Sequence, residues 1–165
     1  MRSCIKIILF TLMFCFLCLA FSFEKNLKKA HSFVMPDISG NRVSLDDFKG
    51  KKVVLVFWAF WCDTWKDCRR VLAQLYPLQE EFQFNIVAVS IDSRFKEEVK
   101  PFIKKGEIKY PVLLDRGSSV SEIYKVKKVP TFYVISENQE ILYSFTGVPK
   151  RANLKQIMKL LEAKP

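Results

Sequence analysis

The sequence has few of the residues on which most cofactor and metal sites depend. Its 165 residues include one histidine, His31, and five glycines. No glycine-rich phosphate loop and no haem-attachment spacing occurs, so the sequence implies no cofactor. His31 is more typical of a surface or capping residue than of a metal ligand, and we predict no metal site. Internal repeats and low-complexity segments are absent too, and the length favours one domain with one core.

The first residues have the composition of an export signal. Arg2 and Lys6 precede an apolar run over residues 7–23, which lies in length between a signal-peptide core and a minimal spanning helix. Cleavage after a small-residue site at residues 20–22 and retention as a membrane anchor through residues 5–23 both stay open. We therefore predict export across the cytoplasmic membrane, with three parts: residues 1–22 as signal peptide or anchor, 23–30 as linker and 31–165 as the folded domain.

The chain is basic, with a formal net charge of +10. Removing the leader takes away only Arg2 and Lys6 and no acidic residue, so the folded domain stays basic. Its lysines are scattered over many segments, and no nucleic-acid motif accompanies them. This pattern predicts a solvated basic surface and no nucleic-acid partner.

Cysteine is scarce outside the leader. Three of the five cysteines, Cys4, Cys15 and Cys18, fall in the leader, and only Cys62 and Cys68 remain for the domain. An exported domain with two cysteines could form a disulfide. Six residues along an ideal helix give about 9 Å of rise, which places the two Cα atoms farther apart than the roughly 7 Å that a disulfide tolerates. A bond between them would require the first helical turns to unwind.

Hydrophobic patterning predicts an α/β domain with a mixed sheet. Residues 52–59 form a continuous apolar run typical of a strand buried on both faces. Pro77 should interrupt the helix that follows. The predicted strands are two short ones within 31–44, then 52–59, 85–91, 111–114, 131–135 and 140–145; the predicted helices are 63–81, 94–105, 118–124 and 152–163.

Cys62 is the strongest candidate for a catalytic residue. It is expected where a buried strand ends and a helix begins, and a thiolate there is stabilised by unpaired N–H groups and the positive end of the helix dipole. Lys66, Arg69 and Arg70 add positive charge, which Asp63 opposes. The pattern therefore predicts a nucleophilic cysteine.

Short motifs in a fixed order cover nearly all of the chain after its leader. They are Phe33–Ile38 with Gly40 and Val43–Leu45, Phe48–Lys51, Phe57–Ala59 with Trp61-Cys62, Pro111–Asp115, Tyr124–Val126, Val129–Phe132 and Gly147. In order and spacing the chain resembles the thioredoxin-like superfamily, and within it the TlpA/ResA group of exported thiol-disulfide oxidoreductases. The resemblance implies a thioredoxin-like fold with helices on both faces of a mixed sheet and an N-terminal β extension.

The resemblance also implies a substrate groove and a class of substrate. Pro130 would follow a cis peptide bond and face Cys62, and the groove would be lined by Trp61, Trp65, Val129, Pro130 and Thr131. Exported protein thiols or disulfides, or a small-molecule thiol, would be the partners.

The chain departs from this family at the second cysteine. The family's Cys-x-x-Cys is replaced by Cys62-Asp63-Thr64-Trp65, so no thiol occupies the position that resolves a mixed disulfide. Val56 is apolar where the family tends to carry a polar residue that assists proton transfer. We therefore predict catalysis through Cys62 alone, with Cys68 as a candidate resolving residue.

Two alternatives remain. A non-catalytic module would keep the groove for peptide binding or use the fold as a scaffold. A thiol peroxidase would need only one cysteine for its first step, although Ala59 stands where that branch carries a threonine. Copper binding is disfavoured because the cysteines are far apart and His31 lies on an early segment.

Overall fold

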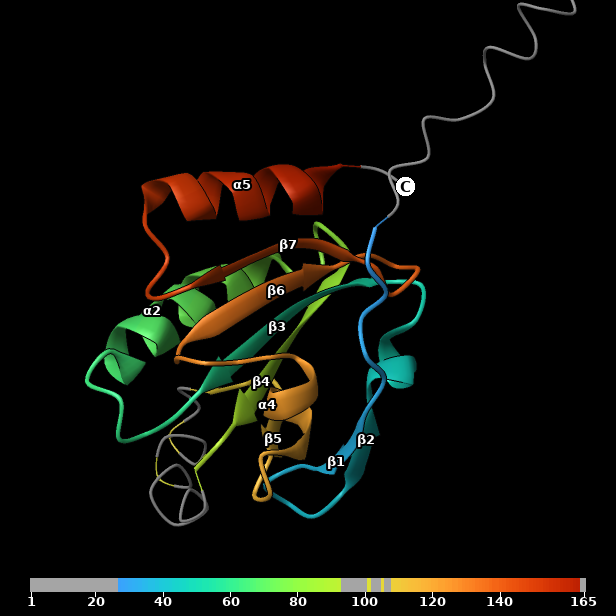
Figure 1. Cartoon of the computed structure of the whole chain (residues 1–165). Helices are drawn as coiled ribbons and strands as arrows, with labels where there is room; N and C mark the ends of the chain where they lie inside the picture. Colours follow the sequence, from blue (N-terminus) through green and yellow to red (C-terminus); the bar gives the residue numbers. More distant parts are fainter. Residues whose placement is uncertain (1–26, 93–100, 102–104, 106–107, 164–165) are drawn as a thin grey trace, which may run out of the picture.

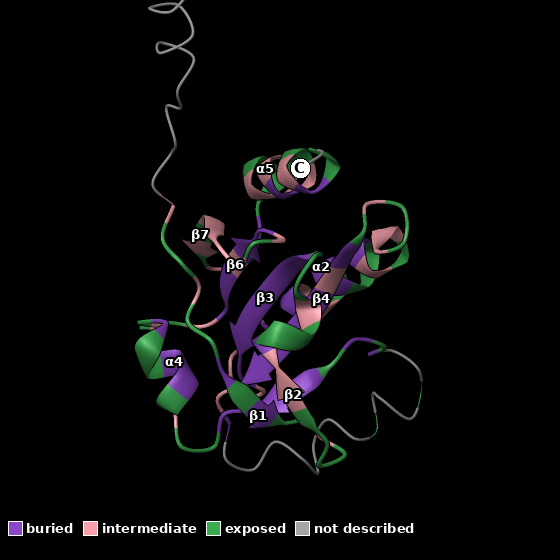
Figure 2. Cartoon of the chain, turned by 90° about the vertical axis from the view of Figure 1, so that its right-hand side faces the viewer, coloured by how far each residue is buried: buried purple, intermediate pink, exposed green. Residues whose placement is uncertain are grey.

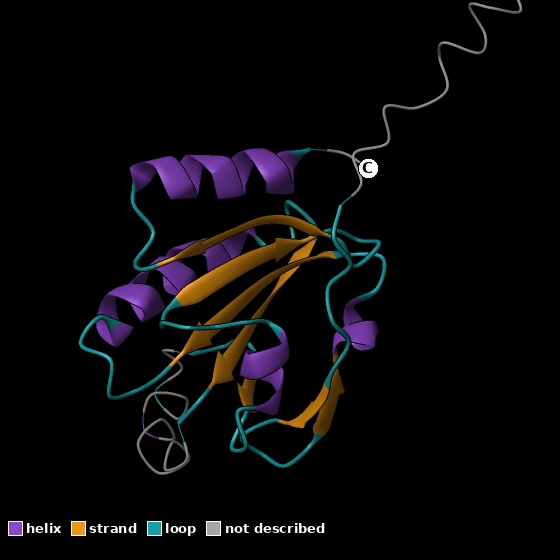
Figure 3. Cartoon of the chain, in the orientation of Figure 1, coloured by secondary structure: helices purple, strands orange, loops and turns teal. Residues whose placement is uncertain are grey.

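A five-stranded mixed sheet forms the centre of the molecule (Figures 1 and 3). The computed structural model describes residues 27–92, 101, 105 and 108–163. The strand order is β5-β4-β3-β6-β7; β3, β4 and β5 are parallel to one another, and β6 and β7 are antiparallel to their neighbours. Their bounds are β3 Lys52–Trp58, β4 Phe84–Ser90, β5 Val112–Leu114, β6 Thr131–Ile135 and β7 Ile141–Thr146.

A small antiparallel sheet precedes the central one. Its strands are β1, Val34–Pro36, and β2, Arg42–Ser44. The short 3₁₀ segment η1, Leu45–Phe48, follows with Ser44 as its N-cap. The amide of Ile38 donates to the carbonyl of Val112 at 3.0 Å, which joins this extension to the outer strand of the central sheet.

The helices are α2 Trp65–Leu75, α4 Ser119–Ile123 and α5 Arg151–Glu162. Two of them, α4 and α5, begin and end within one residue of the predicted positions, whereas α2 is shorter than the predicted 63–81 at both ends. As predicted, the helix containing Trp65 stops before Pro77, and a 3₁₀ segment, η2 Tyr76–Leu78, replaces its last turns. The helix predicted over residues 94–105 falls almost entirely outside the described residues.

Two hydrophobic cores lie on the two faces of the sheet. Alternate residues of β3 point to opposite faces, because side chains alternate along a strand. Val54 and Val56 pack in the core under α2 and α5, whereas Leu55 and Phe57 pack in the core under α4 and the N-terminal extension. Every residue of β3 is buried (Figure 2). The continuous apolar run therefore forms a strand covered on both faces, as predicted.

The described chain begins by pairing with the last hairpin. The amide of Ile141 donates to the carbonyl of Lys28 at 2.8 Å, and the amide of Ala30 donates to the carbonyl of Gln139 at 2.9 Å. Lys29 also forms a 3.1 Å ion pair with Glu140. Residues 28–30, which the sequence assigned to the linker, are thus attached to the sheet. Among the helices of the described residues, none has the length and apolar character to cross a bilayer.

Candidate functional site

The buried strand β3 carries the chain to Cys62. The strand ends at Trp58, and a tight turn follows over residues 60–64. Two hydrogen bonds shape this turn: the amide of Cys62 donates to the carbonyl of Ala59 at 3.2 Å, and the amide of Trp65 donates to the carbonyl of Cys62 at 2.9 Å. Cys62 is half-buried and free of any disulfide. Its sulfur is therefore held at the end of the sheet with part of its surface open.

The helix α2 begins two residues later than predicted. It starts at Trp65, so Cys62 lies in the turn before it, between strand and helix as the sequence indicated. The first amide that bonds four residues back is that of Cys68, which donates to the carbonyl of Thr64 at 3.0 Å.

The sulfur of Cys62 has two polar neighbours. Its Sγ lies 3.2 Å from the hydroxyl oxygen of Thr64 and 3.4 Å from the carbonyl oxygen of Val129. Thr64 stands at the N-cap of α2 but makes no side-chain capping bond, so its hydroxyl is available to the sulfur. The carbonyl of Val129 can only accept from the protonated thiol, whereas the hydroxyl of Thr64 can donate to the thiolate.

The peptide bond between Val129 and Pro130 is cis, as the resemblance implied. Pro130 is buried, and its carbonyl accepts from the amide of Gly147 at 2.7 Å. The next residue, Thr131, is also buried and pairs with Phe57 across the sheet. Its hydroxyl donates to the carbonyl of Lys128 at 2.6 Å. The structure therefore brings Cys62 and the Val129–Pro130 peptide together.

The two tryptophans assigned to the groove lie in different environments. Trp61, the residue before Cys62 in the chain, is 67% exposed. Trp65 is buried, and its ring stacks on Phe60 with a centroid separation of 4.6 Å, while the guanidinium of Arg69 lies 5.7 Å from its centroid. A groove-lining role suits Trp61, whereas burial leaves Trp65 and Thr131 little surface for a substrate.

Cys68 lies inside α2, in the core between the helix and the sheet. It is 1% exposed, and burial raises the pKa of its thiol to about 12, with the nearby Cys62 adding to the rise. A buried, protonated thiol within an intact helix is a poor nucleophile. Resolution by Cys68 would require α2 to open.

Val56 and His31 contribute to the fold and not to the site. Val56 is fully buried and pairs with Phe132 in the sheet. His31 is exposed and precedes β1, and its carbonyl accepts from the hydroxyl of Tyr124 at 2.7 Å. Sequence reasoning missed Thr64 as a neighbour of the sulfur. A hydroxyl two residues after a candidate nucleophile was the available signal.

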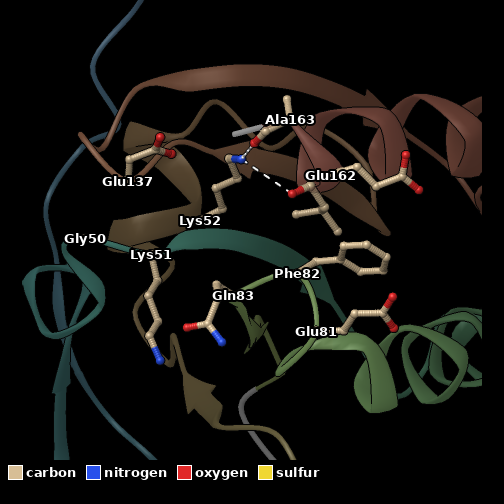
Figure 4. Close-up of a pocket in the computed structure, with 10 residues that line it drawn as sticks. Gly50, Lys51, Lys52, Glu81, Phe82, Gln83, Glu137, Glu162 and Ala163 are labelled. Atoms are coloured by element: carbon tan, nitrogen blue, oxygen red, sulfur yellow. Dashed lines mark hydrogen bonds between the residues drawn. The ribbon is translucent and has the colours of Figure 1, made fainter. Parts of the chain in front are cut away.

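A separate cavity of about 640 Å³ lies at the opposite end of β3 (Figure 4). Lys52, the first residue of that strand, is buried there. Its ammonium donates to the carbonyl of Leu161 at 3.4 Å and to the carbonyl of Ala163, at the end of α5. This cation occupies the negative end of the helix dipole, so it has a structural role.

Comparison with known families gives one match over most of the chain. Residues 27–144 match the model of the AhpC/TSA family. That span contains both domain cysteines and the cis Val129–Pro130 bond.

Similar proteins with curated descriptions are thiol-disulfide oxidoreductases or thioredoxin-like proteins. The chain is 32% identical over 132 residues to the thiol-disulfide oxidoreductase ResA of Bacillus thuringiensis subsp. konkukian, a match that covers 80% of this chain and 76% of the relative. It is 33% identical over 137 residues to the thioredoxin-like protein YneN of Bacillus subtilis, covering 81% and 78% of the two chains.

Solved structures agree on the fold. StoA from Bacillus subtilis superposes with a TM-score of 0.63 at 26% identity, covering 78% of this chain and 97% of that one. The thioredoxin domain of a thiol-disulfide oxidoreductase from Bacteroides vulgatus gives a TM-score of 0.65 at 27% identity, covering 81% and 96%. The predicted thioredoxin-like fold and the predicted resemblance to ResA-type proteins are both confirmed.

Proposed function

The chain belongs to the AhpC/TSA family, and from this premise we propose that it is an exported thiol-disulfide oxidoreductase that works through Cys62 alone. The observation that carries the proposal is the unequal state of the two thiols. Cys62 is partly open beside the carbonyl of Val129, whereas Cys68 is buried in a helix. Thiol-disulfide chemistry is what the names of the similar proteins describe.

The first step is attack by the Cys62 thiolate on one sulfur of a substrate disulfide. A new S–S bond forms to Cys62, the substrate S–S bond breaks, and the electron pair leaves with the other substrate sulfur, which then takes a proton from water. Thr64 supports this step because its hydroxyl lies 3.2 Å from Sγ and can donate to the thiolate. We assign the substrate surface to the Val129–Pro130 peptide, whose Val129 carbonyl lies 3.4 Å from Sγ, and to the exposed Trp61.

The second step needs a thiol from outside the chain. Trp65 stands where the family's resolving cysteine would be, and burial holds Cys68 protonated. A small-molecule thiolate therefore attacks the mixed disulfide, and Cys62 leaves as a thiolate. Exported proteins with thiols or disulfides are the proposed partners, and the apolar leader supports export, either cleaved or kept as an anchor.

One observation favours a second candidate function, a peptide-binding module without turnover. The carbonyl beside the cis Val129–Pro130 bond lies 3.4 Å from Cys62 Sγ, and Trp61, the residue before Cys62, is 67% exposed. A surface with these features can hold an extended peptide without any chemistry at the sulfur. This module would bind equally well after Cys62 is replaced.

A pair of serine variants tests the proposal. Cys62→Ser should abolish reduction of a disulfide substrate in the presence of a small-molecule thiol, and Cys68→Ser should keep at least about half of the rate, because only Cys62 is accessible. Mass spectrometry of trapped mixed disulfides should find partners on Cys62 alone.

Three results would contradict it. Equal peptide binding by Cys62→Ser with no turnover by the wild-type protein would support the binding module. Sulfenic acid on Cys62 after stoichiometric peroxide, together with peroxide turnover, would support a thiol peroxidase. Loss of turnover in Cys68→Ser with the fold intact would assign resolution to Cys68.

A further inference from the structure

Three lysines lie within four residues of one another on the connection between α4 and β6. Lys125, Lys127 and Lys128 are all exposed, and together they line one side of a groove of about 480 Å³. No acidic residue lines this groove. Within the described part of the chain, none of the three ammonium groups forms an ion pair or a hydrogen bond. The positive charge of this surface, which we call the lysine groove, is therefore not neutralised locally.

The rest of the lysine groove is lined by residues of the sheet. They are Thr131 and Tyr133 on β6 and Ser144, Phe145 and Thr146 on β7. Register pairs these residues across the two strands, Thr131 with Thr146 and Tyr133 with Ser144. The hydroxyls of Thr131 and Tyr133 donate to the backbone carbonyls of Lys128 and Tyr124, and the hydroxyl of Thr146 donates to that of Thr131. The donors that remain for the oxygens of an anion are the three ammonium groups and the hydroxyl of Ser144.

The backbone that carries the lysines is fixed at both ends. The hydroxyl of Tyr133 donates to the carbonyl of Tyr124 at 2.6 Å, just before the lysines, and the hydroxyl of Thr131 donates to the carbonyl of Lys128 at 2.6 Å, at their end. Both bonds start from the sheet. The position of the lysine groove is therefore set by the fold. The sequence alone indicated only lysines scattered over the surface.

The same segment reaches the reactive sulfur. Lys128 directly precedes Val129, whose carbonyl lies 3.4 Å from Cys62 Sγ, and neighbouring Cα atoms are about 3.8 Å apart. Figure 1 shows the connection from α4 running along the sheet to the start of β6. A substrate bound at the sulfur therefore lies one residue along the chain from Lys128, which lines the groove.

We propose that the lysine groove binds the carboxylate of a small acidic thiol, and that Cys62 removes this thiol from mixed disulfides with proteins. The inference rests on the proposed function, since it names the substrate class of the same site. A groove of this size is in the range of small-molecule sites, and the missing second cysteine already demands a thiol from outside the chain.

The reaction balances with that thiol as the only co-reactant. The Cys62 thiolate attacks the sulfur of the small thiol in the mixed disulfide, and the protein sulfur leaves as a thiolate that takes a proton from water. A second molecule of the small thiol, as its thiolate, attacks the sulfur bound to Cys62. The products are the reduced protein, the symmetrical disulfide of the small thiol and the Cys62 thiolate, so one small thiol is consumed for each mixed disulfide.

A matched pair of disulfides tests the inference on the full-length protein. The symmetrical disulfides of N-acetyl-Glu-Cys-amide and N-acetyl-Gln-Cys-amide differ only in the carboxylate. We expect wild-type Cys62 to react about 10-fold faster with the acidic disulfide at low ionic strength, after division by the rates of a free small thiol. High salt should reduce that ratio.

Two charge-matched variants assign the effect to the groove. Replacing all three groove lysines by glutamine should bring the ratio close to one. A control with the same loss of charge, Lys51→Gln, Lys155→Gln and Lys159→Gln, alters exposed lysines that lie outside the groove and should keep the ratio. Equal loss in both variants would assign the preference to net charge and overturn the inference.

A binding measurement separates the inference from the proposed function. The S-methylated acidic peptide cannot react, and calorimetry should detect its binding to wild type and not to the groove variant. Reaction of Cys62 without any preference for the acidic disulfide would overturn the inference and leave the proposed function standing. An inert Cys62 would overturn the proposed function, with the substrate class that rests on it. A much faster reaction with a long acidic peptide disulfide would replace the small thiol by an acidic protein segment.

Discussion

A polar side chain lies near each end of β3, and the two differ in how far they are buried. At the first end, the ammonium of Lys52 is buried and donates to carbonyls at the end of α5. At the other end, Cys62 is half-buried, and its neighbours Thr64 and Val129 leave part of the sulfur open. The strand therefore begins at a buried ammonium whose hydrogen bonds hold the end of α5, and it leads to a thiol that is partly exposed.

This difference predicts that stability and activity can be changed separately. A buried group with all its partners present is costly to replace, because the partners lose their bonds as well. A partly exposed group with weak contacts can be replaced at little cost in stability. The following substitutions test this separation, from the largest expected change in the free energy of unfolding to the smallest.

Lys52→Met should give the largest loss of stability. The carbonyls of Leu161 and Ala163 would lose a charged donor, which we expect to lower the free energy of unfolding by about 1.5–3 kcal/mol. Urea unfolding measures the loss, and the rate of exchange at Cys62 should not change. The control is Lys51→Met, because Lys51 is exposed and points away from Lys52 (Figure 4). A loss of exchange activity in Lys52→Met with the fold intact would show that the two ends are coupled.

Cys68→Ala should cost about 1 kcal/mol at pH 7, because it removes a buried sulfur from a packed core. Thermal or urea unfolding gives the value, and exchange through Cys62 should persist. A wild-type stability in Cys68→Ala would mean that its side chain is not packed as described.

The stability difference between wild type and Cys68→Ala should depend on pH. Burial raises the pKa of Cys68 to about 12 in the folded state, against about 8.5 for a free thiol. The unfolded chain therefore loses this proton first, and the stabilisation from the neutral thiol is complete below pH 8.5 and declines as the pH rises towards 12. Urea unfolding between pH 7 and pH 10.5 should show wild type losing its advantage over Cys68→Ala. A constant difference would contradict the raised pKa.

Cys62→Ser should have the smallest effect on folding, within about 0.5 kcal/mol of wild type, although it removes the proposed nucleophile. The same urea series measures it. A loss of more than 1 kcal/mol would show that the sulfur contributes to packing, and the contrast between the two ends of β3 would be lost.

Sequence patterning predicted the parts of the fold that depend on long apolar runs. The buried run at residues 52–59 became β3 within one residue, and Pro77 ended α2 because proline cannot donate the helical hydrogen bond. The cis bond before Pro130 came from family resemblance, since nothing in residue chemistry alone requires it.

Features that depend on contacts between distant segments could not be predicted. Lys52 is a charged residue, and its burial became understandable only with the end of α5 next to it. The start of α2 at Trp65 was missed by two residues, because helix boundaries depend on local capping. The lysine groove needed the register of β6 and β7, which the sequence does not contain.

The pairing of Lys28 and Ala30 with the β6–β7 hairpin also places the start of the described chain at the end of the sheet opposite Cys62. Strand β6 starts at Thr131, near Cys62, and ends at Ile135, next to the turn that these N-terminal residues contact. Five residues of strand span about 17 Å. If the protein were tethered through the chain before Lys28, the Cys62 sulfur would therefore lie at the far end of β6 from the point of attachment. It would face substrates in solution.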